Sequence, residues 1–165
     1  MFFRSELKKY TGPTTVATTG AVAACAALGT VLTDPAHRWH RSLRKPAWQP
    51  PAAFPVAWTL LHLDIAAINS VVLTDLIHCG QREAAEEHAA ALGANLALNA
   101  GWCGIFFRAR RPWLATLSAG ALALSSADLT RRAYRSAPIR GVALAPYVVW
   151  TACATVLSTA IAVKN

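Results

Sequence analysis

Five long runs of mainly apolar residues divide the chain, and short charged clusters separate them. The runs cover residues 13–33, 54–77, 89–107, 112–130 and 141–163. A helix of about 20 residues, rising about 1.5 Å per residue, is long enough to cross a bilayer. The runs are rich in Ala and Leu and lack the alternation of a half-buried strand. The pattern predicts an all-α fold, an integral membrane five-transmembrane-helix bundle forming one domain over residues 1–165.

The composition supports a membrane protein rather than a soluble basic one. Of 165 residues, 55% are apolar and 15% are charged, against roughly 25% charged in soluble domains. The 16 Lys and Arg exceed the 8 Asp and Glu, but they lie in short clusters between apolar runs. Since no basic face for nucleic acid is formed, the predicted partner is the lipid membrane.

The topology leaves two points open. The first run follows a basic segment, as in a cleaved signal peptide, but it is longer than the usual apolar core of such peptides. Lys and Arg divide equally between the two sets of loops, so they do not predict the orientation.

The Arg- and Ala-rich composition and the absence of a transit-like presequence favour a bacterial cell envelope.

The loop at residues 34–53 is unusually rich in proline and tryptophan. Proline fixes φ and restricts the residue before it, so this loop is expected to be stiff. Trp39 and Trp48 beside Arg and Lys are typical of an interfacial belt. The alternative is a structured lid over one end of the bundle.

Three motifs occur in order along the chain. The first is Leu-Arg-Lys-Pro-Ala-Trp-Gln-Pro-Pro at 43–51, followed by Phe54 and by Val-Ala-Trp-Thr-Leu-Leu at 56–61. The second is Leu-Asn-Ala-Gly-Trp at 98–102 with Phe106-Phe107, and the third is Ala-Pro-Tyr-Val-Val-Trp at 145–150. With the five-run layout, they make residues 14–163 resemble the TspO/MBR family, the tryptophan-rich sensory proteins related to the translocator protein (peripheral-type benzodiazepine receptor).

The resemblance implies five membrane helices around a pocket that the first loop closes. Family members bind tetrapyrroles such as protoporphyrin and haem, and also sterols and synthetic ligands. It therefore implies protoporphyrin or haem as ligand, with no obligatory cofactor. Some bacterial members promote light-dependent breakdown of protoporphyrin through pocket tryptophans, which makes Trp58 and Trp150 the candidate catalytic residues.

Helical phase gives the third run two different faces. Four of its polar and aromatic residues lie within about 60° of one another. They are Asn95, Asn99, Trp102 and Phe106. Gly93, Ala97 and Gly101 form a small-residue row almost opposite, which is a possible homodimer seam. Alternatively the glycine row packs within the bundle and the Asn pair bonds across helices.

The predicted ligand site combines residues of the loop and of three runs. Trp58 and His62 are i, i+4 neighbours, and Trp150 aligns with Ala154. Flat aromatic walls could stack on a porphyrin while Lys45 or Arg44 meets a propionate. The full set of predicted ligand-binding residues is Trp39, His40, Lys45, Pro46, Trp48, Trp58, His62, Asn95, Asn99, Trp102, Phe106, Tyr147, Trp150 and Ala154.

Ionisable residues give weaker signals. Asp64 and His62 point about 200° apart on a helix, so we expect Asp64 to bond a Ser, Thr or Asn of a neighbouring helix. Relatives generally carry Tyr near position 62 and an apolar residue near position 64. His40 or His62 could ligate haem iron, since imidazole is a common axial ligand. The four Cys and five His lack metal-binding spacing, so no metal site is predicted.

Three functions remain open. The first is a sensory or regulatory protein that binds a tetrapyrrole, and the second is a light-dependent enzyme that degrades protoporphyrin. The third is a small-molecule transporter, although no charged pathway or inverted repeat is found in the sequence. A loose sterol pattern, Leu129-Tyr134-Arg140, lies in the fourth loop and is not used to predict a sterol ligand.

Overall fold

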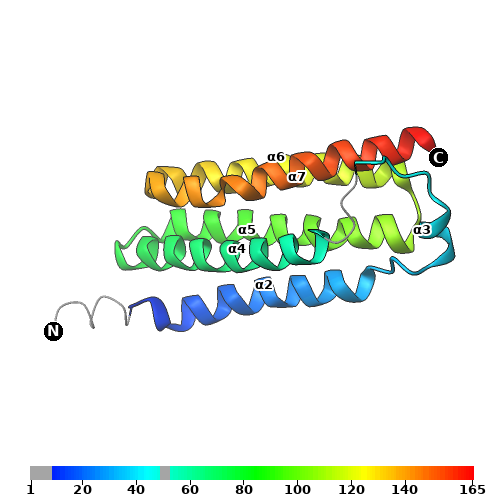
Figure 1. Ribbon diagram of the computed structural model, residues 1–165. Coiled ribbons are helices and arrows are strands. Elements are labelled where there is room, and N and C mark those ends of the chain that lie inside the picture. The colour runs from blue at the N-terminus through cyan, green and yellow to red at the C-terminus, as the bar shows by residue number, and fades with distance from the viewer. Residues whose placement is uncertain (1–8, 49–52) are drawn as a thin grey trace.

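A computed structural model describes residues 9–48 and 53–165 as helices and short connections (Figure 1). Five long helices lie side by side in an elongated bundle, and α2 begins at the end opposite to the one where α7 ends (Figure 1). The elements are η1 (Lys9–Thr11), α2 (Pro13–Leu32), α3 (Arg38–Ser42), α4 (Ala53–His78), α5 (Arg82–Cys103), η2 (Gly104–Arg108), α6 (Pro112–Ser136) and α7 (Pro138–Lys164). Residues 49–52 of the predicted loop lie outside the described residues.

Proline and left-handed residues determine where the long helices begin and turn. Pro13, Pro112 and Pro138 stand at the first turn of α2, α6 and α7, where the missing N–H costs no hydrogen bond. Gly80 turns the chain between α4 and α5 with φ of 72°, and Arg110 does so between α5 and α6 with φ of 55°. These short turns make consecutive helices antiparallel neighbours.

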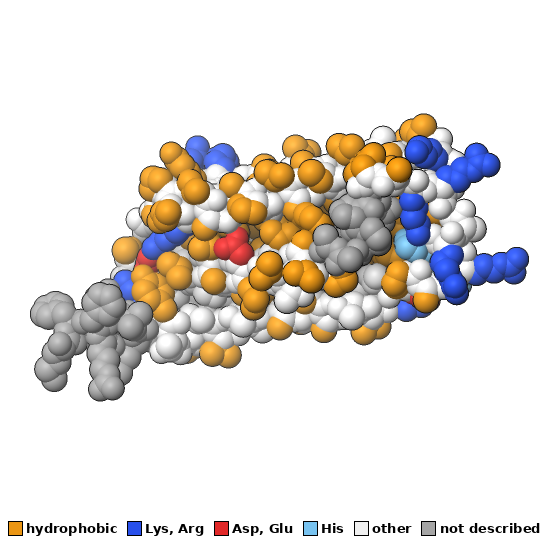
Figure 2. All heavy atoms as spheres, viewed as in Figure 1, with side chains coloured by type: hydrophobic (Ala, Val, Ile, Leu, Met, Phe, Trp, Pro, Cys, Tyr) orange, Lys and Arg blue, Asp and Glu red, His pale blue; other side chains and the backbone are white. Residues whose placement is uncertain are grey.

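Four of the five long helices are long and apolar enough to cross a membrane. They are α2, α4 from Pro55, α5 continued through η2, and α7. On the face shown in Figure 2, hydrophobic side chains are spread along the bundle between its two ends, and Lys and Arg lie toward the ends. The prediction of a helical integral membrane protein is confirmed. Helix α6 falls outside this group because Asp128 and several arginines occupy its second half.

The run 13–33 matches α2 to within one residue, whereas the other four predicted runs were shorter than the helical segments that contain them. The run 89–107 begins seven residues inside α5, and the run 112–130 stops six residues before α6 ends. Hydropathy marks the part of a helix that meets lipid, whereas charged turns continue the same helix into water. The run 141–163 is also extended, back to Pro138.

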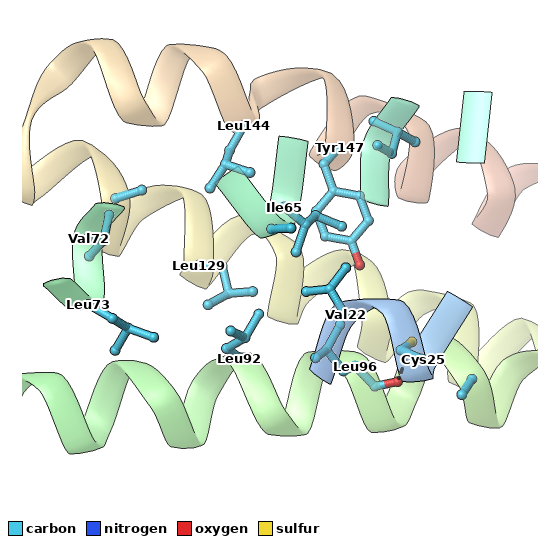
Figure 3. Packing of buried hydrophobic residues seen from close by; sticks show 14 of the residues in the cluster. Val22, Cys25, Ile65, Val72, Leu73, Leu92, Leu96, Leu129, Leu144 and Tyr147 are labelled. Carbon is cyan, nitrogen blue, oxygen red and sulfur yellow. Dashed lines mark hydrogen bonds between the residues drawn. The ribbon is translucent and has the colours of Figure 1, made fainter. Parts of the chain in front are cut away.

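Buried aliphatic residues from all five long helices form the core. Tyr147 of α7 points into the bundle, with Ile65 of α4 beside its ring (Figure 3). Helices α6 and α7 pack closely along their length and are joined only by Ala137. A Cβ on Gly141 would lie 2.4 Å from Cβ of Tyr134, so this close approach requires glycine.

Candidate functional site

An aromatic pair joins α4 to α7. The rings of Trp58 and Trp150 lie 6.3 Å apart, edge to face at 86°. His62 follows Trp58 by one helical turn, with the two ring centres 5.5 Å apart. All three side chains are half-buried, and hydrophobic side chains line a depression between α4 and α7 (Figure 2). The structure therefore brings together the predicted residues Trp58, His62 and Trp150.

His62 has one nitrogen that is bonded and one that is not. Its Nδ1 lies 2.7 Å from the carbonyl oxygen of Trp58. A carbonyl only accepts, so Nδ1 carries the hydrogen and Nε2 keeps a lone pair. Nε2 is buried and has no hydrogen-bond partner within the described part of the chain. A buried polar atom without a partner costs about 1–3 kcal/mol, so a ligand group that pairs with it is favoured.

A second aromatic cluster lies at the end of the bundle that holds α3, which we call the loop end. The ring of Trp102 stacks on that of Phe106 at 5.4 Å, and Trp39 of α3 meets Phe106 edge to face at 5.6 Å. His40 lies 5.3 Å from Phe107. The indole Nε1 of Trp102 is buried without a hydrogen-bond partner in the described residues. Trp39, His40, Trp102 and Phe106 thus form a cluster separate from the Trp58–Trp150 pair.

The loop itself presents both buried and exposed predicted residues. Nδ1 of His40 lies 3.0 Å from the Pro35 carbonyl oxygen and 3.3 Å from Nζ of Lys45. Burial lowers the pKa of His40 and also that of Lys45. Pro46 is buried, while Trp48 is 57% exposed, as an interfacial tryptophan would be.

Three of the predicted ligand contacts, Asn95, Asn99 and Tyr147, form hydrogen bonds to one another. The Tyr147 hydroxyl donates to Oδ1 of Asn95 at 2.7 Å and accepts from Nδ2 of Asn99 at 3.2 Å. Nδ2 of Asn95 lies 3.1 Å from Oγ of Ser125 and 3.3 Å from Oγ of Ser126. This polar network joins α5, α6 and α7, and it matches the alternative in which the Asn pair bonds across helices. Ala154 is half-buried on α7.

The sequence analysis missed a buried polar pair. Nε2 of His88 lies 2.8 Å from Oδ1 of Asn69, and their exposed fractions are 2% and 0%. The predicted run began one residue after His88, although its position seven residues before Asn95 places both on one helix face. Asp64 is half-buried and forms none of the expected bonds to Ser, Thr or Asn within the described residues.

The small-residue row of α5 faces outward. Gly93 and Ala97 are exposed and Gly101 is half-buried. A Cβ on either glycine would meet nothing within 4 Å, so no other helix of the described chain covers the row. Gly93 also borders a groove of about 530 Å³ between α2, α4 and α5.

Charge differs strongly between the two ends of the bundle. The opposite end contains the ion pairs of the described residues, such as Asp75 with Lys9 and Arg140. Among the described residues, the loop end has one carboxylate side chain, Asp34, beside a larger set of cations. These are Arg38, Arg41, Arg44, Lys45, Arg108, Arg110, Arg111 and Lys164. Their uncompensated charge makes the loop end a positive surface.

Four apolar helices and an aromatic site between helices define a multi-pass integral membrane protein. The chain belongs to the TspO/MBR family, whose sequence model matches residues 17–164. The resemblance identified in the three motifs is therefore confirmed.

Two bacterial relatives cover most of the chain. A tryptophan-rich sensory protein of Cereibacter sphaeroides is 31% identical over 142 residues, which are 83% of this chain and 84% of the relative. Protein CrtK of Rhodobacter capsulatus is 32% identical over 149 residues, 84% of each chain. The human translocator protein is 32% identical over 123 residues, covering 73% of this chain and 71% of its own. The two bacterial relatives, together with the apolar helices, support the predicted bacterial membrane location.

Proposed function

We propose that this protein is a sensory or regulatory membrane protein that binds a tetrapyrrole between α4 and α7, beneath the first loop. The observation that carries the proposal is the Trp58–Trp150 pair with the unpartnered Nε2 of His62 beside it. Indole faces stack on flat π-systems, and a mainly apolar site with few polar atoms is typical of small-molecule binding.

The residues present fit a tetrapyrrole in three respects. The aromatic walls match its flat ring system, and the buried Nε2 offers one polar contact inside the site. The positive loop end supplies cations, among them Arg44 and Lys45, for its carboxylates. The family membership supports the same class of ligand.

The proposal includes a membrane arrangement. All five long helices, α6 included, span the bilayer, because α6 packs along the whole of α7 and pairs Asp128 with Arg131 and Arg132. Two copies associate through the small-residue row of α5, since Gly93 and Gly101 leave space for another helix.

A dark titration of the detergent-purified protein with protoporphyrin tests ligand binding. Tryptophan quenching and the Soret band are followed in the wild type and in the double variant Trp58→Phe/Trp150→Phe. We expect saturable one-site binding that the double substitution weakens. Trp113→Phe is the matched control, because that tryptophan is 60% exposed on α6. Binding that does not saturate, or that all variants share, would mean partition into the micelle and would refute the proposal.

A second candidate function is light-dependent degradation of protoporphyrin. It is favoured by the close contact between Trp58 and Trp150, which places two oxidisable rings at one ligand site. Under illumination, irreversible loss of the porphyrin spectrum that disappears in Trp150→Phe would support an enzyme. Loss at the rate of free porphyrin would exclude this activity.

A further inference from the structure

His62 differs from the other described histidines in the surroundings of its Nε2. Nδ1 of His78 also lies 2.8 Å from a backbone carbonyl oxygen, that of Thr74, but the His78 side chain is exposed. Nε2 of His88 is bonded to Asn69, and Nε2 of His37 lies 3.0 Å from Arg110. Nδ1 of His40 is shared between a carbonyl and Lys45. His62 combines an Nδ1 bonded to a backbone carbonyl with a buried and unpartnered Nε2.

This arrangement prepares an imidazole to bind a metal. A hydrogen bond from Nδ1 to a carbonyl fixes the tautomer and the ring orientation, and it raises the basicity of Nε2. Metal-ligating histidines commonly have this outer contact. The carbonyl belongs to Trp58, so one helical turn of α4 supplies both an aromatic wall and the oriented nitrogen.

We propose that Nε2 of His62 is an axial ligand of haem iron, so that the site favours the iron tetrapyrrole over free-base protoporphyrin. This assignment rests on the proposed function. The nitrogen supplies both electrons of the new bond, and the water or hydroxide that occupies this position on free haem leaves. Imidazole is a common axial ligand, and free-base protoporphyrin has no metal to receive it.

The surroundings make His62 available for this role. Within the described residues, no group of three or more His, Cys, Asp or Glu side chains gathers to hold a metal ion. Coordination by one side chain is sufficient here, because the porphyrin supplies four nitrogens to the iron. The Trp58 ring lies 5.5 Å from the His62 ring and contacts Trp150 edge to face, so the aromatic side chains of α4 and α7 lie beside this histidine.

The test uses ferric haem and protoporphyrin as separate probes of the full chain in detergent. We expect wild type with haem to show the Soret and visible bands of histidine ligation. His62→Ala should lose these bands and weaken haem binding by about tenfold or more, a change of about 1.4 kcal/mol. Protoporphyrin affinity should fall by less than haem affinity, because free-base protoporphyrin loses only a polar contact and not a bond to iron. Unchanged helicity by circular dichroism shows that the variant remains folded. Free imidazole should restore the bands in His62→Ala.

The control variant is His78→Gln, which changes an exposed histidine of α4 whose Nδ1 also contacts a backbone carbonyl, and it should keep the bands. Unchanged bands in His62→Ala, or equal weakening of both porphyrins, would overturn the assignment of His62. If wild type binds protoporphyrin but shows no histidine-ligated haem, this inference fails and the proposed function stands. If wild type binds neither, both fail.

Discussion

Tyr147→Phe separates a structural role of the polar network from a role in ligand binding. The substitution keeps the ring and removes the hydroxyl that links Asn95 to Asn99, both nearly fully buried. Hydrogen bonds between membrane helices contribute about 0.6 kcal/mol each on average, so two lost bonds give about 1.2 kcal/mol. Leaving the amide atoms buried and unpaired costs more, about 1–3 kcal/mol per group. We expect a loss of at least about 1.2 kcal/mol in the free energy of unfolding, and of about 2–6 kcal/mol where both amide atoms stay unpaired.

The assay is reversible unfolding by SDS in mixed micelles, with helicity followed by circular dichroism. Protoporphyrin titration of the same preparations measures ligand affinity. Because the network atoms bond to one another, we expect the dissociation constant of Tyr147→Phe to change by less than about twofold. Tyr134→Phe is the matched control, since this tyrosine is 54% exposed and lies outside the network. An unchanged free energy of unfolding together with a tenfold weaker complex would refute the reasoning, because the hydroxyl would then face the ligand.

Four further outcomes are expected. Gly141→Ala should lower the thermal midpoint of unfolding, because the added Cβ would lie 2.4 Å from Tyr134 of α6 and overpacking costs about 1–3 kcal/mol. Gly20→Ala is the control and should not lower the midpoint, because a Cβ there has no neighbour within 4 Å. Gly93→Leu should convert the proposed dimer to monomer, because a large side chain would fill the space that the small-residue row leaves for a second α5. Chemical cross-linking and the mass from light scattering measure this change, and an unchanged dimer would exclude this seam. Burial lowers the pKa of His40 in the folded loop, so as the pH falls this imidazole is protonated more readily in the unfolded loop than in the folded one. The loop should therefore lose stability as pH falls below about 6.5, and the positive charge of Lys45, which also lowers the pKa of His40, adds to the effect. Limited proteolysis should detect this loss, and His40→Gln should abolish it. Raising salt should slow association of protoporphyrin more than that of its dimethyl ester, through the positive loop end.

The helices were predictable because spanning a bilayer is a requirement on the sequence of one segment at a time. The start of α5 was not predictable, since Arg82 to His88 form about two charged helical turns that a search for apolar runs leaves out. Phase on a helix correctly placed Trp58 beside His62, a contact within one element.

Contacts between elements were harder to predict. Phase gives the direction of a side chain around its helix but not its depth along the bundle. Trp102 and Trp150 were therefore assigned to one site, although Trp102 lies in the cluster at the loop end. The amide of Asn95 has the same phase whether it meets a ligand or Tyr147, and only the neighbouring helices decide between them.

The tight pairing of α6 with α7 has a consequence for biogenesis. Helix α6 is less apolar than its partners, and Asp128 is satisfied by Arg131 and Arg132 of the same helix. With Ala137 as the only residue between the two helices, neither can enter the bilayer far ahead of the other. We expect the translocation machinery to release them together as a hairpin in which apolar α7 carries α6 across. A long hydrophilic insertion at Ala137 should leave α6 outside the membrane.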